Sequence, residues 1–71
     1  MTDIELLKEH ISESGMTMVA VAKRAKIGRV TLYNRLNGKG EFNASEIMGL
    51  SQALGLKKSE RDKIFLSKGS T

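Results

Sequence analysis

The sequence of 71 residues predicts an all-α fold of five short helices. The chain contains no proline and seven glycines, and several of the glycines directly follow an apolar segment. Within those segments the apolar residues recur every three or four positions, the period of a helix, whereas a strand would alternate every second position. The glycines are therefore interpreted as helix ends, and β-structure has little support.

Length and composition predict one small domain, residues 1–71, with a single compact core from a 39% hydrophobic content. The chain has no cysteine and one histidine, which excludes disulfides and leaves no ligand set for a zinc site. No apolar run approaches the length of a membrane span, and the N-terminus is acidic where a signal peptide would be basic. We expect a cytoplasmic protein without metal or cofactor.

The first two helices are predicted from caps and apolar stripes. Thr2 and Glu5 have the spacing of a capping box, and Gly15 ends the first helix, whose apolar face carries Ile4, Leu7 and Ile11. Thr17 is a natural N-cap for the second helix, which ends near Lys26. The buried stripe of this second helix is expected to be Met18, Val21, Ala22 and Ala25.

The third helix is predicted from Gly28 or Arg29 to Leu36, after a short break that makes a tight corner with the second. Leu32 and Leu36 form its inner edge because they are four residues apart. The helical period turns the following residues outward or to the flanks: Arg29, Val30, Thr31, Tyr33, Asn34 and Arg35. The segment Asn37-Gly38-Lys39-Gly40 breaks the helix.

Two further helices complete the prediction. Asn43 and Glu46 resemble a capping box for a fourth helix with an apolar stripe of Ile47, Leu50 and Leu54 and a stop at Gly55. Ser59 with Asp62 is expected to begin a short fifth helix carrying Ile64, Phe65 and Leu66. Residues 67–71 are expected to form a flexible tail. The pattern does not explain Gly49, which lies in mid-helix off the apolar stripe.

Charge is distributed unevenly along the chain. Residues 1–13 hold four acidic side chains against one lysine, residues 14–40 hold six basic and no acidic side chains, and residues 41–71 sum to +1. A basic block in mid-chain predicts one positively charged face, although a solvated basic surface would give the same pattern.

Residues 16–40, MTMVAVAKRAKIGRVTLYNRLNGKG, resemble the helix-turn-helix of the lambda-repressor-like family, of the Cro and repressor type. Residues 41–56, EFNASEIMGLSQALGL, and 60–65, ERDKIF, are similar to short phage and prophage regulators of that family. The resemblance covers residues 4–66. It implies a helix-turn-helix at about 17–36, with the third helix in the major groove of double-stranded DNA.

The resemblance also implies roles for single residues. The base-reading positions would be Arg29, Val30, Tyr33 and Asn34. The positions adjacent to DNA or in contact with phosphate would be Thr17, Lys23, Gly28, Thr31, Arg35, Asn37 and Lys39. The chain departs from the family at the turn, where Lys26 replaces the usual glycine at a cost of roughly 1 kcal/mol, so the turn could be reshaped around Gly28.

Two classes of function are consistent with these features. The first is a Cro-like transcriptional repressor, with a homodimer on DNA for which Phe65 and Leu66 are candidate contacts. The second is a modulator on the same fold that binds a partner repressor through Met18, Val19 and Ala20. Enzyme activity is not expected, because His10 is the only histidine and no serine has a histidine–acid arrangement.

Overall fold

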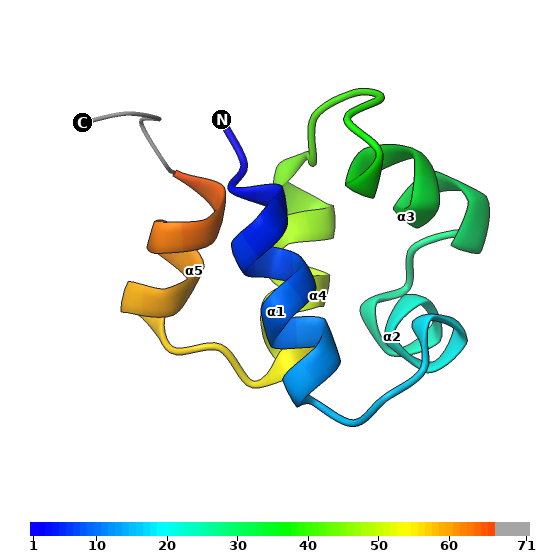
Figure 1. Ribbon diagram of the computed structural model, residues 1–71, viewed down its shortest axis with the longest axis horizontal. Coiled ribbons are helices and arrows are strands. Elements are labelled where there is room, and N and C mark those ends of the chain that lie inside the picture. Colours follow the sequence, from blue (N-terminus) through cyan, green and yellow to red (C-terminus); the bar gives the residue numbers. More distant parts are fainter. Residues whose placement is uncertain (67–71) are drawn as a thin grey trace.

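A computed structural model describes residues 1–66 of the chain and contains five α-helices (Figure 1). They are α1 (Ile4–Glu13), α2 (Met18–Ala25), α3 (Arg29–Leu36), α4 (Ala44–Leu54) and α5 (Lys58–Phe65). Residues 1–66 form no strand, so the predicted all-α fold is confirmed. None of these helices is long and apolar enough to cross a membrane. The tail predicted at 67–71 lies outside the described residues.

The helices are arranged so that α3 lies at the periphery. Figure 1 shows α5 on one side of α1 and α4, and α2 and α3 on the other. α2 packs mainly against α4, while α1 packs against α5. The amide of Asp3 donates a hydrogen bond of 2.6 Å to the carbonyl of Ile64, which fastens the start of α1 to α5. One side of α3 therefore remains free of other helices.

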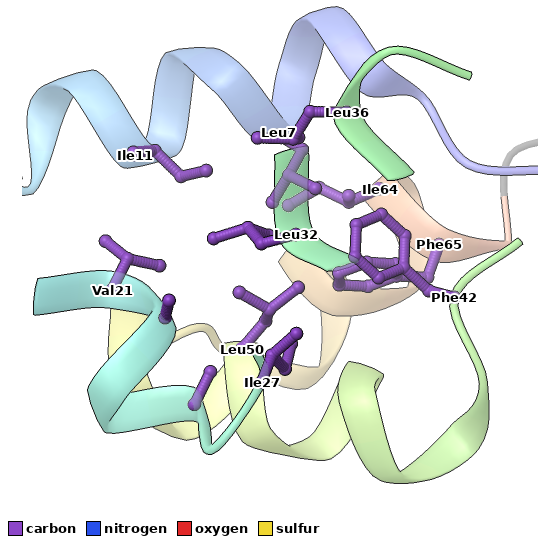
Figure 2. Close-up of a cluster of buried hydrophobic side chains, with 12 residues drawn as sticks. Leu7, Ile11, Val21, Ile27, Leu32, Leu36, Phe42, Leu50, Ile64 and Phe65 are labelled. Carbon is purple, nitrogen blue, oxygen red and sulfur yellow. The ribbon is translucent and has the colours of Figure 1, made fainter. Parts of the chain in front are cut away.

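A single apolar core joins all five helices (Figure 2). The predicted inner edge of α3 is confirmed, because Leu32 and Leu36 are both buried. In the stripe of α2, Val21, Ala22 and Ala25 are buried and Met18 is half-buried. Within residues 1–66, the buried apolar residues are Leu7, Ile11, Val21, Ala22, Ala25, Ile27, Leu32, Leu36, Phe42, Leu50, Ile64 and Phe65.

Two of the predicted helix starts are wrong by one or two residues. α1 is capped by Asp3, whose carboxylate accepts from the amide of Leu6 at 3.1 Å, and not by Thr2 with Glu5. Asp3 is as good a cap as Thr2, and its amide is already held by Ile64. α5 begins at Lys58, where Glu60 accepts from the amide of Lys57 at 2.8 Å, so the Ser59–Asp62 start is wrong.

The remaining predicted caps are confirmed. Thr17 accepts from the amide of Ala20 at 3.1 Å at the start of α2. Asn43 and Glu46 form the reciprocal capping box of α4, with bonds of 2.8 and 3.0 Å. These caps fix where α2 and α4 begin. In the chain, α3 lies between these two helices.

Candidate nucleic-acid interface

α2 and α3 are joined by a tight turn over residues 26–28. Lys26 is the C-cap of α2 and has left-handed backbone angles, φ 60° and ψ 39°. The amide of Ile27 reaches back to the carbonyl of Ala22 at 3.0 Å, and the Ile27 side chain is buried, which is the arrangement of a Schellman motif. The expected reshaping around Gly28 does not occur, because Gly28 has φ −59° and is the N-cap of α3. Burial of Ile27 and this hydrogen bond offset the strain at Lys26.

α3 presents an outer face opposite its buried edge. On a helical period of 100° per residue, Val30 and Asn34 point away from the edge formed by Leu32 and Leu36, and Tyr33 and Arg29 lie on one flank. Val30 is 71% exposed and Tyr33 is 45% exposed, while Arg29 is exposed and Asn34 is half-buried. These four residues are called the outer face of α3 below. The predicted base-reading positions thus lie together on one accessible surface.

A second group of predicted residues follows directly on α3. Asn37 is its C-cap and Lys39 is exposed. The amide of Lys39 donates to the carbonyl of Asn34 at 2.8 Å, and that of Gly38 to the carbonyl of Arg35 at 3.1 Å. Residues 37–40, called the 37–40 turn below, are therefore folded back against the C-terminal end of α3.

The other predicted contacts lie at helix starts or on α2. Thr17 is exposed at the N-terminus of α2, where the first amides of the helix have no partner within it. Gly28 is exposed and Thr31 is half-buried at the N-terminal end of α3, and Lys23 is exposed on α2. Helix N-termini of this kind favour anions, because unpaired amides and the helix dipole both point outward.

The charges of this region are of one sign. Residues 14–40 contain six basic side chains and no acidic one. Five of the six are exposed, namely Lys23, Arg24, Lys26, Arg29 and Lys39. A segment of this composition attracts a polyanion.

Arg35 differs from the other predicted contacts, since its side chain is turned into the protein. Its Nη1 donates to the carbonyl of Lys39 at 3.2 Å, and its Nε lies 3.5 Å from Oε1 of Glu46. Sequence reasoning identified Glu46 as a capping residue but missed this pairing. The two residues are on different helices separated by a loop, so no local pattern relates them.

These features define the chain as a helix-turn-helix protein: two short helices joined by a tight turn, the second exposed along one face. A family model described as helix-turn-helix matches residues 7–60, well over half of the chain. The chain therefore belongs to the lambda-repressor and Cro-like helix-turn-helix family. No curated protein and no solved structure gives a match.

Membership of this family makes the protein a DNA-binding helix-turn-helix regulator. DNA is accordingly its partner. The family is one of regulatory domains that are generally not enzymes.

Proposed function

We propose that the protein is a Cro-like repressor of phage or prophage origin, which occupies operator DNA with α3 in the major groove. The observation that carries this proposal is the division of α3 into two faces. Leu32 and Leu36 anchor the inner edge of α3 in the core. The outer face is therefore not needed to hold the helix in place and is available to contact DNA. The likeness of residues 41–56 and 60–65 to short phage regulators supports the phage origin.

Each residue of the outer face has a chemistry suited to base edges. Arg29 can donate two hydrogen bonds to guanine O6 and N7, and the amide of Asn34 can pair with adenine N6 and N7. Val30 is 71% exposed and can pack on a thymine methyl. Tyr33 offers a ring and a hydroxyl for a base or a phosphate.

The surrounding residues are proposed to bind the phosphate backbone, which positions the outer face without reading sequence. Unpaired amides at the starts of α2 and α3 and the lysines supply suitable donors. The proposed phosphate contacts are Thr17, Lys23, Gly28, Thr31, Asn37 and Lys39.

We further propose that two copies bind a palindromic operator, with half-sites about one helical turn apart. Of the two residues predicted for the dimer contact, Phe65 is buried against Phe42, with ring centroids 5.6 Å apart. Leu66 is 64% exposed beside Met48, along a groove between α4 and α5. A second copy seated on Leu66 and Met48 would cover apolar surface that the monomer leaves in water.

The second candidate function, a modulator that binds a partner repressor, is favoured by one observation. Val19 is 51% exposed at the start of α2, next to the half-buried Met18. An exposed apolar residue there offers a small docking surface for a protein.

The deciding experiment measures binding to DNA and to protein side by side. Fluorescence anisotropy should detect binding to DNA from upstream of the protein's own gene. A random duplex of equal length should compete poorly with that DNA. Mixing with the neighbouring repressor, followed by size-exclusion chromatography, should give two separate peaks. Tight binding to the repressor that is lost in Val19→Asp, with no preferred DNA, would favour the modulator instead.

A further inference from the structure

Arg35 links three segments of the chain through one guanidinium group. The side chain belongs to α3, yet it is only 25% exposed and points away from the outer face. Nη1 donates to the carbonyl of Lys39, in the 37–40 turn, at 3.2 Å. Nε is buried and lies 3.5 Å from Oε1 of Glu46, in the first turn of α4.

Glu46 is itself held in place, so it presents a fixed carboxylate to Arg35. Its side chain is 13% exposed, and the same Oε1 accepts from the amide of Asn43 at 3.0 Å. The amide of Glu46 in turn donates to Asn43 at 2.8 Å. The capping box of α4 thus also serves as the anchor for the guanidinium.

Gly40 makes room for this arrangement. A β-carbon built on Gly40 would lie 2.7 Å from Nη1 of Arg35, and the residue has φ +89°. The guanidinium therefore lies against the backbone of the 37–40 turn. An alanine there would both strain the backbone and push the Arg35 side chain away.

The 37–40 turn needs such a support, because Gly38 and Gly40 both have positive φ and give the chain wide conformational freedom. Two backbone hydrogen bonds tie the turn to the end of α3, from the amides of Gly38 and Lys39. The guanidinium of Arg35 adds the connection from the turn to α4.

We propose that Arg35 is a positioning residue, which orders the 37–40 turn so that Lys39 and Asn37 meet the DNA backbone, and that it does not contact DNA itself. The proposal rests on the proposed DNA-binding function. Its physical basis is that a turn ordered before binding loses less entropy when it binds.

The first test is Arg35→Lys, which keeps the positive charge but removes the planar guanidinium. Only the guanidinium can bond the carbonyl of Lys39 and pair with Glu46 at the same time. A lysine would serve a direct phosphate contact nearly as well, since it binds phosphate as a point charge. We expect Arg35→Lys to weaken binding about tenfold, on operator and random DNA alike. In a Lys39→Ala background the same change should have a smaller effect, because one of the two contacts it supports, that of Lys39, is already absent and only that of Asn37 is left.

The second test compares two neutralised acids, Glu46→Gln and Glu41→Gln. Both variants remove one negative charge near the 37–40 turn, but only Glu46 faces Arg35 in an ion pair. Glu41→Gln should bind DNA as well as the original protein or better, whereas Glu46→Gln should bind less tightly. A direct Arg35–phosphate contact predicts the opposite for Glu46→Gln, since the released guanidinium would be free to bind.

The closing measurement does not need DNA. Amide hydrogen exchange in Arg35→Lys should speed up at Gly38 and Lys39, while the amide of Leu50 in α4 keeps its protection. Unchanged exchange in the 37–40 turn, or full DNA binding by Arg35→Lys, would overturn the positioning role. A protein that binds no DNA at all would overturn the proposed function, and the exchange data would still decide whether Arg35 orders the turn.

Discussion

Gly49 of α4 lies directly against the backbone of Ala25, the last residue of α2, so closely that no side chain fits between the two helices. A β-carbon built on Gly49 would collide with the carbonyl oxygen of Ala25 and lie 3.3 Å from its Cα. Ala25 immediately precedes Lys26, where the chain turns toward α3. The close packing of α2 on α4 therefore sets the position of the helix-turn-helix relative to the core.

Substituting Gly49→Ala should destabilise the protein by about 1–3 kcal/mol, because the backbone oxygen it meets cannot move aside without shifting α2. Alanine gains about 1 kcal/mol in helix propensity, which only partly offsets the clash. Urea unfolding followed by circular dichroism measures the difference. Gln52→Ala, at an exposed position of the same helix, is the control and should stay within about 0.5 kcal/mol of the original protein. A raised midpoint for Gly49→Ala would show that α2 and α4 can separate freely.

The left-handed conformation of Lys26 predicts that glycine is preferred there. Lys26→Gly and Lys26→Ala remove the same charge, so their comparison isolates the backbone. The glycine variant should be the more stable of the two by about 1 kcal/mol, because alanine retains the β-carbon that disfavours positive φ. Thermal melts of the two variants in one buffer measure this. Equal melting temperatures would mean that the turn relaxes to another geometry.

The two faces of α3 should respond differently to the same kind of truncation. Leu32 is fully buried, so Leu32→Ala should cost roughly 2–5 kcal/mol and unfold a large share of so small a domain. Val30 is 71% exposed on the same helix, and Val30→Ala should change the free energy of unfolding by less than about 0.5 kcal/mol. Similar losses in both variants would show that Val30 packs against another part of the chain.

The five helices could be predicted because each carries its own local signals. Apolar spacing identified Leu32 and Leu36, and the caps Thr17 and Asn43 act on amides only three residues away. The starts of α1 and α5 were missed where two possible N-cap positions lay within one or two residues of each other. At α1, whether Thr2 or Asp3 caps the helix depends on a tertiary contact, the hydrogen bond from the amide of Asp3 to the carbonyl of Ile64.

Features that depend on contact between helices could not be predicted. Gly49 has a function only because Ala25 lies opposite it, and nothing in the surrounding sequence of α4 indicates that neighbour. Arg35 falls on the flank of α3 in the helical pattern, which is equally compatible with solvent and with the protein interior. Its pairing with Glu46 depends on how the loop returns the chain to α4.

The proposed phosphate contacts predict a steep dependence of DNA affinity on salt. Each neutralised phosphate contributes a slope of about −0.9 in log affinity against log salt, so Lys39→Ala should make the slope shallower by about that amount. The loss should be similar on operator and random DNA. Lys63→Ala, on α5 at the other side of the molecule, removes the same charge and is expected to leave the slope nearly unchanged (Figure 1). Identical slopes for Lys39→Ala and Lys63→Ala would mean that net charge alone governs binding.

The outer face of α3 is predicted to determine sequence preference, in contrast to the lysines. Arg29 is exposed and Asn34 lies opposite the buried edge of α3, so Arg29→Ala and Asn34→Ala should leave the melting temperature almost unchanged. Each should lose roughly 1–3 kcal/mol of binding at the operator, because a bidentate contact to a base edge is removed. Binding of Asn34→Ala to random DNA should change little, since that binding is mainly a phosphate interaction.

The quantity to measure is therefore the ratio of operator affinity to random-DNA affinity for each variant at one salt concentration. Arg29→Ala also removes a positive charge and should weaken random binding slightly, whereas Asn34→Ala is neutral and gives the cleaner comparison. A base-pair change at the position that Asn34 reads should affect the original protein but not Asn34→Ala, because the variant has no contact left to lose. If both variants retain the original ratio on a verified operator, α3 does not read the DNA sequence, and the modulator that binds through Val19 becomes the better explanation of this surface.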